Sequence, residues 1–231
     1  MNGKFMWKSF KQSVEIQITN KTEDVTLYNP RSYCYSGYNS MPPNPRIAPG
    51  VMESCEFTNS VIHFRGCVGL LVYEADTFTL AILFSNPFDY NIFCMELAME
   101  ISFHKAHLGN LENIYTRMYS SQSTSTGKDT VFHRVKLGAC QEAAMVFAGH
   151  VRVTATMSNA AKSVIKVVVE NQDSSSSESK GGTTHWPWAA SARGMDKLCP
   201  CCCKHQAKSA AFNKWLSKAI VHLNSCCVVL R

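Results

Sequence analysis

The 231-residue chain lacks a run of apolar residues long enough to cross a bilayer as a helix, which takes about 20 residues. Any role at a membrane must therefore come from a surface, an interfacial helix or an assembly. Charged residues are also few, at 17% of the chain, and no block of lysines and arginines occurs among them. Without such a block or a recognisable nucleic-acid motif, the net charge of +6 does not indicate nucleic acid as a partner.

Signals of catalysis and of export are missing as well. The histidines show no spacing typical of metal ligands or of a nucleophile and its base, and no motif of the common hydrolases occurs. We therefore expect neither catalytic residues nor a cofactor. The chain starts MNGKFMWKSFKQS, where charges interrupt every apolar run, so we expect no signal peptide. Cytoplasmic storage and non-classical export stay open.

The 11 cysteines fall into two groups that call for different interpretations. Five are scattered in apolar contexts, which predicts buried free thiols: Cys34, Cys55, Cys67, Cys94 and Cys140. Six crowd into the C-terminal tail: Cys199, Cys201, Cys202, Cys203, Cys226 and Cys227. Cys199 and Cys202 have the spacing of one zinc-binding pair, but the adjacent Cys226 and Cys227 suit a second pair poorly, so we assign no metal site. Palmitoylation and an unselected extension are the alternatives for this tail.

Alternating apolar residues predict short β-strands from residue 13 to residue 170. In residues 13–19, Val14, Ile16 and Ile18 alternate with polar residues, and residues 78–84 show the same period of two. Other strands are expected at residues 24–29, 51–57, 60–64, 68–73, 97–101, 131–137, 144–157 (with a break near Gly149) and 163–170. Residues 30–50 are dense in Pro, Gly, Ser and Asn, which predicts a long irregular loop.

One segment has helical spacing instead. In LENIYTRMY, residues 111–119, Tyr115 and Tyr119 lie four residues apart on one broad face. Asn110 is a suitable N-cap, and Glu112 lies in the first turn, where the helix dipole favours an acid. Many short strands with so little helix predict a mainly β protein: a β-sandwich flanked by one or two short α-helices.

The composition divides the chain into four parts. Residues 1–12 are a short amphipathic segment, and residues 13–170 carry the pattern of the sandwich. Residues 171–184 are a Ser/Gly-rich linker of low complexity. Residues 185–231 form a divergent Cys-rich tail that nothing in the sandwich pattern requires, and we expect it to be poorly ordered.

The stretch FSNPFDYN, residues 84–91, follows the strand predicted at residues 78–84. Pro87 has no N–H for a sheet ladder, so it ends the strand, and an aromatic loop at the edge of a sheet should follow. At this point the sequence resembles the actinoporins, the pore-forming cytolysins of sea anemones, and their relatives in fish. The family has a stretch of the type LAVLFSVPYDYNWYSNWW after a strand that begins GAVG. The corresponding text here is GCVGLLVY followed by TLAILFSNPFDYNIF.

The resemblance spans about residues 13–170 and includes the helical tyrosine pair. It implies recognition of sphingomyelin through its phosphocholine head group, followed by homo-oligomerisation on the membrane into a cation-permeable pore. It also implies a secreted protein that acts at a target-cell membrane. Choline is a quaternary ammonium ion, which aromatic faces attract through cation–π interactions. Carried over position by position, the head-group site consists of Ser36, Val68, Ser85, Pro87, Phe93, Tyr115 and Tyr119.

The chain departs from the family pattern at several positions. Ser120 stands where the family has a third tyrosine, and Phe93 replaces another tyrosine. Ile92, Glu96 and Leu97 lie in the region of the family's exposed tryptophans, which suit the bilayer interface. We therefore expect weaker membrane affinity or a changed lipid preference.

The segment before Ser13 is also shorter than a membrane-spanning helix. The chain as written should therefore bind membranes more readily than it permeabilises them. The alternative function is a non-lytic lipid- or glycan-binding module, similar to a lectin, on the same fold.

Overall fold

The computed structural model describes residues 11–60, 65–121, 124–138 and 143–172. Apart from residues 91–93, these residues belong to one compact unit. The strand predicted at residues 60–64 lies largely outside the described residues. The amphipathic start of the chain, Cys140 and almost all of the linker and the tail lie outside them too.

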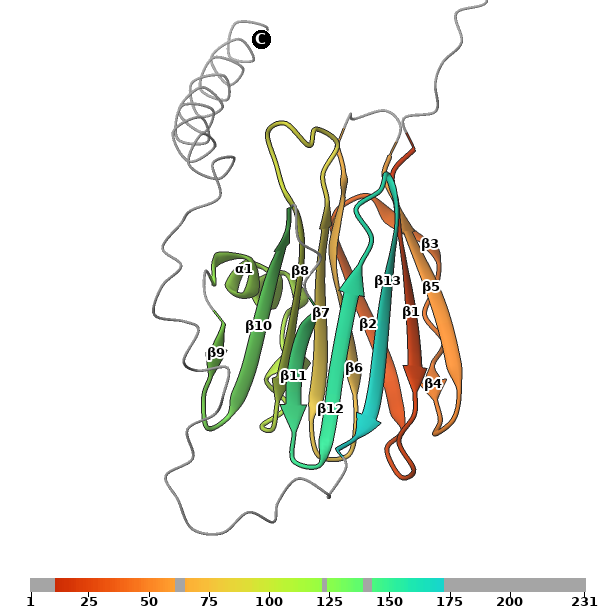
Figure 1. Cartoon of the computed structure of the whole chain (residues 1–231), viewed down its shortest axis with the longest axis vertical. Coiled ribbons are helices and arrows are strands. Elements are labelled where there is room, and N and C mark those ends of the chain that lie inside the picture. The colour runs from red at the N-terminus through yellow and green to blue at the C-terminus, as the bar shows by residue number, and fades with distance from the viewer. Residues whose placement is uncertain (1–10, 61–64, 122–123, 139–142, 173–231) are drawn as a thin grey trace, which may run out of the picture. The chain divides into compact units, whose positions relative to one another are not determined.

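The unit consists of two β-sheets with a short helix on the outside of one of them (Figure 1). The six-stranded sheet has the order β11 (Ala144–Ala148), β12 (Val151–Met157), β13 (Lys162–Asn171), β1 (Ser13–Asn20), β5 (Met52–Thr58) and β3 (Tyr38–Met41). The seven-stranded sheet has the order β4 (Arg46–Ile47), β2 (Leu27–Ser36), β6 (Cys67–Glu74), β7 (Thr79–Asn86), β8 (Met95–Ser102), β10 (Thr130–Leu137) and β9 (Ser125–Thr126). Helix α1 covers Leu111–Ser120 and follows the 3₁₀ turn η2 at Ala106–Leu108. The prediction of a mainly β sandwich with a short helix is confirmed.

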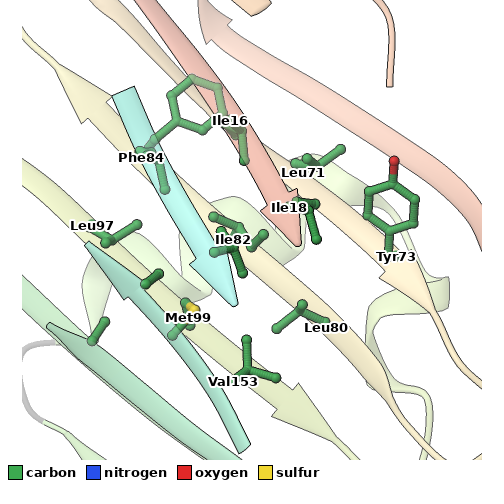
Figure 2. Close-up of a cluster of buried hydrophobic side chains, with 14 of the residues drawn as sticks. Ile16, Ile18, Leu71, Tyr73, Leu80, Ile82, Phe84, Leu97, Met99 and Val153 are labelled. Atoms are coloured by element: carbon green, nitrogen blue, oxygen red, sulfur yellow. The ribbon is translucent and has the colours of Figure 1, made fainter. Parts of the chain in front are cut away.

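The core between the sheets is built by the inward residues of alternating strands. Val14, Ile16 and Ile18 of β1 are buried, whereas Glu15 and Gln17 between them are only partly buried. Figure 2 shows Ile16 and Ile18 among side chains of the other sheet, such as Phe84 of β7. Because each such side chain loses most of its water contact, its burial contributes about 1.5–3 kcal/mol before the entropy cost of ordering.

Strands β7 and β8 are buried on both faces, unlike β1. Their second face packs under α1, where Leu83 of β7 and Ala98 of β8 meet Ile114 and Met118 of the helix. This explains why residues 79–86 and 95–102 are nearly continuous in apolar character, since a strand covered on both sides has little need of polar residues. The helix therefore lies on the outer face of the seven-stranded sheet, and that face holds the candidate site.

The irregular loop predicted for residues 30–50 is wrong in its first part, which forms the end of β2 and all of β3. β2 tolerates Pro30 because its pairing with β6 shifts register between Tyr28 and Arg31, so no ladder bond is required there. Beyond Tyr28, where its pairing with β4 ends, β2 pairs with β6 alone among the strands that the structure describes. The composition of this segment signals bulges in an edge strand as well as turns.

β2 and β3 belong to different sheets although one residue, Gly37, separates them. Gly37 has a φ of +96°, which only glycine adopts without strain. A Cβ at this position would also come within 2.4 Å of the Thr58 carbonyl oxygen. The chain therefore crosses from one sheet to the other at Gly37, with Tyr35 before the crossing and Tyr38 after it.

Candidate functional site

The outer face of the seven-stranded sheet brings three of the predicted site residues into one row. Ser36 of β2 pairs with Val68 of β6, and Val68 pairs with Ser85 of β7. Ser85 in turn pairs with Glu96 of β8, which pairs with Lys136 of β10. Directly paired residues of antiparallel strands point to the same face of a sheet. The row Ser36–Val68–Ser85–Glu96, called the polar row below, therefore lines one end of the face that α1 covers.

The two serine hydroxyls of the polar row differ in their hydrogen bonding. The Ser36 hydroxyl donates a hydrogen bond of 2.7 Å to the Gly66 carbonyl oxygen. The Ser85 side chain is only 7% exposed, and its hydroxyl makes no hydrogen bond to another residue that the structure describes. A nearly buried hydroxyl without a protein partner is suited to bind a ligand oxygen or water.

Helix α1 places the predicted tyrosine pair above this face. The Asn110 side chain caps the helix by accepting hydrogen bonds from the backbone N–H groups of Glu112 and Asn113, as the sequence predicts. Tyr115 and Tyr119 then stack on each other, with ring centroids 5.6 Å apart and an angle of 22° between the rings. Tyr115 is only 6% exposed, whereas Tyr119 is 42% exposed. The spacing of four residues predicts a shared face but not this difference in burial.

Two further tyrosines join the pair, and sequence reasoning missed both. Tyr35 of β2 stacks on Tyr115 with centroids 5.4 Å apart and an angle of 14°, and Tyr33 meets Tyr115 at 5.5 Å in a tilted arrangement. Both lie in the segment that was predicted to be an irregular loop. We call Tyr33, Tyr35, Tyr115 and Tyr119 the tyrosine stack. The two tyrosines of YCYS, one residue apart, were the available signal. Nothing in the sequence indicated that they lie beside residues about 80 positions away.

An internal cation already occupies part of the stack. The Arg134 guanidinium carbon lies 5.4 Å from the centroid of the Tyr119 ring. Arg134 Nη1 donates to the carbonyl oxygens of Tyr119 and Ser121, both at 2.8 Å, and Nη2 donates to the Glu96 carboxylate. The Arg134 side chain is only 8% exposed. The guanidinium thus ties the end of α1 to β8 and β10 and fixes the Tyr119 ring.

Glu96 therefore has a different place from the one the sequence suggested. It stands in the region of the family's interfacial tryptophans, yet it is buried in β8 and paired with Arg134. Burial and the Glu96 carboxylate raise the pKa of the Tyr119 hydroxyl, although Arg134 opposes the shift. The hydroxyl therefore stays protonated at neutral pH and is able to donate a hydrogen bond to an anionic oxygen.

The remaining two predicted residues belong to the loop after β7. Pro87 is buried and follows the last residue of that strand. Phe93 is 45% exposed and lies outside the compact unit. The structure thus brings Ser36, Val68, Ser85, Tyr115 and Tyr119 to one face and places Pro87 directly after the strand that carries Ser85.

The FSNPFDYN loop is held by Asn86. Its buried amide nitrogen lies 3.1, 3.3 and 2.9 Å from the carbonyl oxygens of Ser13, Ala160 and Ala161, and its side-chain oxygen accepts from the Tyr90 hydroxyl at 2.9 Å. Gly66 allows this loop to approach, because a Cβ there would lie 2.2 Å from the Asn86 carbonyl oxygen. One aromatic of the motif, Tyr90, thus anchors the loop through its hydroxyl.

Replacing Asn86 with valine, the residue found in the family stretch, should lower the free energy of unfolding by about 2 kcal/mol. The change leaves the buried carbonyl oxygen of Ser13 and the partly buried one of Ala161 without their donor, and a buried polar group that loses its partner costs about 1–3 kcal/mol. Urea denaturation followed by circular dichroism measures the effect. Tyr90→Phe removes only the tyrosine hydroxyl and should cost less than half as much. Equal stabilities of Asn86→Val and the unmodified protein would contradict this account of the motif.

A polar network is sealed beneath α1 and η2. His107 is fully buried; its Nε2 lies 2.8 Å from Glu100 Oε1 and its Nδ1 lies 2.7 Å from the Thr79 hydroxyl. Glu100 also accepts from Arg117 of α1 at 2.7 and 2.5 Å. Burial by itself disfavours the charged carboxyl, but the hydrogen bonds from His107 and Arg117 outweigh it and hold the pKa of Glu100 at about 2.

The hydroxyl, imidazole and carboxylate that are linked in this network are the three groups of a catalytic triad. Thr79 and His107 are fully buried, however, and Glu100 is nearly so, so no substrate reaches the hydroxyl. Nucleophilic catalysis requires access of the reacting carbon to the nucleophile. The network instead fastens η2 and α1 to the sheet that carries the polar row.

Four of the five scattered cysteines lie in the described part of the chain. Cys55 and Cys67 are buried free thiols, as predicted, and burial raises the pKa of each to about 12. Cys34 is a half-buried free thiol, and Cys94 is half-buried. Within the described ranges, no three metal-ligating side chains come together. No helix in the described part of the chain is long and apolar enough to span a membrane.

Comparisons with known proteins concern the family and the fold of the chain. The model of the family described as sea anemone cytotoxic protein matches residues 56–160, which include β6, β7, the FSNPFDYN loop and α1. The resemblance to the actinoporins is thereby confirmed. Among solved structures, the crystal structure of the lipid-binding protein Nakanori is similar, with a TM-score of 0.52, 15% sequence identity, and coverage of 68% of this chain and 70% of that chain. At this identity the likeness concerns the fold. A comparison with curated proteins gives no match.

Proposed function

Because the sandwich resembles the actinoporins in sequence and in fold, we propose that the protein binds the phosphocholine head group of sphingomyelin in membranes. The observation that carries the proposal is the tyrosine stack above the polar row, where aromatic faces and hydroxyls meet at one end of the sheet. A phosphocholine head group needs both, since its ammonium is attracted to aromatic rings and its phosphate accepts hydrogen bonds.

The proposed site consists of the seven residues carried over from the family. Ser85, Tyr115 and Tyr119 supply hydroxyls for the phosphate, while Ser36 and Val68 shape the row beside them. Pro87 and Phe93, which follow β7 in the sequence, complete the seven carried-over positions. No residue of the site is assigned a catalytic role, and no cofactor or nucleic acid takes part.

Binding then leads to homo-oligomers that form a cation-permeable pore in the target-cell membrane, the action of a secreted cytolysin. Two steps are separable by measurement. Flotation with vesicles that contain or lack sphingomyelin tests the binding. Release of an entrapped dye, compared at equal amounts of bound protein, tests the pore. Dye release without bound protein, or flotation that is equal on both kinds of vesicle, would contradict the proposal.

Tyr119→Ala should weaken binding to sphingomyelin vesicles by about five- to tenfold. Tyr119 is the member of the helical pair with a large exposed surface, and the substitution removes both its ring and its hydroxyl. The variant should keep its fold, because Arg134 still binds the carbonyl oxygens at the end of α1. The matched control is Phe147→Ala, which removes a similarly exposed ring from β11 of the other sheet. Equal losses in both variants would refute a specific site.

Lipid binding without lysis is the second candidate. The observation in its favour is the identity of the residues after the loop: Ile92, Glu96 and Leu97 replace interfacial tryptophans, and the last two are buried in β8. Strong vesicle binding with no dye release would support this candidate over the pore. Both candidates require the same head-group site.

A further inference from the structure

We propose that Tyr35, which lies outside the seven-residue site, is the ring that receives the quaternary ammonium of the head group. This inference rests on the proposed function and assigns the cation contact within that site. It starts from which surfaces of the tyrosine stack are already covered. A cation binds a ring when it lies within about 6 Å of the centroid, over the face.

The space between Tyr115 and Tyr119 is closed to such a guest. A cation held between two rings lies within about 6 Å of each ring centroid. The two centroids are then farther apart than in a pair of directly stacked rings, up to about twice that contact distance. The two centroids are only 5.6 Å apart, and the rings stack directly on each other. Tyr115 has in addition Tyr33 and Tyr35 against it and is almost fully buried. The helical pair therefore does not form a two-sided cage.

Tyr119 is exposed, but it already has its cation. The Arg134 guanidinium over its ring is fixed by two helix carbonyl oxygens and by Glu96. Tyr115 also stacks on the Tyr119 ring, so two groups already cover the aromatic surface that a second cation would need. Tyr119 therefore contributes its hydroxyl, which is protonated and able to donate to a phosphate oxygen.

Tyr35 lies at the end of the tyrosine stack and, unlike Tyr115 and Tyr119, has an accessible ring without a cation from the described part of the chain. It is 60% exposed, and among the described residues its only ring contact is Tyr115. Within the same ranges, no cation lies over its ring, and no hydrogen bond holds its hydroxyl. Tyr115 supports the Tyr35 ring from the helix, so the ring is oriented before the ligand arrives. Pre-orientation lowers the entropy cost of binding.

The position of Tyr35 also connects it with the polar row. Its neighbour Ser36 begins the row, and the Ser36 hydroxyl bond to the Gly66 carbonyl oxygen holds the end of β2 against the start of β6. A register shift between Cys34 and Ser36 marks a bulge at Tyr35. Tyr33 and Tyr35 are two residues apart in the strand and therefore share a face, where both contact Tyr115. The bulge adds one residue to β2, so Ser36, directly after Tyr35, still pairs with Val68.

Substitutions at Tyr35 test the assignment because the residue is exposed and its removal should not unfold the domain. Tyr35→Phe keeps the ring, whereas Tyr35→Leu keeps apolar surface and loses the aromatic face. We expect Tyr35→Phe to bind phosphocholine and sphingomyelin vesicles within about twofold of the unmodified protein, and Tyr35→Leu to bind both about five- to tenfold more weakly. Tyr38→Leu is the matched control, since Tyr38 is similarly exposed but lies beyond Gly37 in the other sheet.

The measurements are titration with soluble phosphocholine, titration with choline chloride, and flotation with sphingomyelin vesicles. A loss in Tyr35→Leu with all three probes assigns the ammonium contact to the ring. A loss on vesicles alone, or an equal loss in Tyr38→Leu, would mean that Tyr35 only inserts into the interface and would overturn the inference. Binding by Tyr35→Leu at the level of the unmodified protein would overturn it too. If the unmodified protein itself binds neither phosphocholine nor vesicles, the proposed function fails instead, so the two failures are distinguishable.

Discussion

Glu100→Gln should lower the free energy of unfolding by about 3 kcal/mol at pH 7, one of the two largest effects that we expect. The carboxylate of Glu100 is buried and accepts hydrogen bonds from His107 and from both terminal nitrogens of Arg117. An amide of the same shape cannot hold this charged arrangement, and breaking a buried ion pair costs about 3–5 kcal/mol. The lower end applies because the Arg117 side chain is 47% exposed and regains contact with water.

The pH dependence gives a second signature of the same residue. The pKa of Glu100 is about 2 in the folded protein, below the ordinary value of 4.5. The charged carboxylate therefore stabilises the fold fully above about pH 4.5, and this contribution is lost as the pH falls toward 2. The difference in stability between the unmodified protein and Glu100→Gln should accordingly shrink over that window.

Urea denaturation at several pH values between 7 and 2 measures both effects. Glu170→Gln is the matched control, because Glu170 also pairs with an arginine, Arg152, but at the protein surface. Exposed pairs contribute at most about 1 kcal/mol, so the control should change little. A constant difference between Glu100→Gln and the unmodified protein from pH 7 to pH 2 would show that the carboxylate charge is not what stabilises the network.

The strands illustrate how far periodicity alone leads. Val14, Ile16 and Ile18 pack inward as their alternation predicts, and Gly149 separates β11 from β12 as expected. The prediction of an irregular loop at residues 30–41 was wrong because Pro, Gly and Asn occur both in turns and in bulged strands. Most of this segment forms a strand because it pairs with β6. That partner is 30 or more residues away in sequence, beyond the range of local patterns.

The candidate site shows the same limit more clearly. The helix, its N-cap and the tyrosine pair follow from residues close in sequence. Tyr35 and Arg134, by contrast, reach the pair from β2 and β10, and no spacing in the sequence connects these elements. The burial of Glu96 could not be foreseen either, because its partner Arg134 lies 38 residues further along the chain. Long-range polar and aromatic contacts are set by tertiary packing, which a single sequence does not display.

Tyr115→Ala should destabilise the domain by about 3–5 kcal/mol, the other large effect, and this changes how the helical pair must be tested. Tyr115 lies at the centre of the tyrosine stack and packs against Leu70 and Leu83 of the sheet within one buried cluster. Truncation of a buried aromatic residue loses its transfer energy and leaves a cavity, with costs in this range. Loss of lipid binding in this variant would therefore report unfolding as much as a missing contact.

Tyr115→Phe separates the two roles, because it keeps the packed ring and removes only the hydroxyl. We expect its stability to stay within about 1 kcal/mol of the unmodified protein, whereas its binding to sphingomyelin vesicles falls if the hydroxyl contacts the phosphate. Tyr119→Ala should be intermediate, with a stability loss of about 1 kcal/mol since its ring is partly exposed. Chemical denaturation ranks the three variants before any vesicle is added. A Tyr115→Ala variant as stable as Tyr119→Ala would show that the stack is not part of the core, and that its rings are free to open toward a ligand.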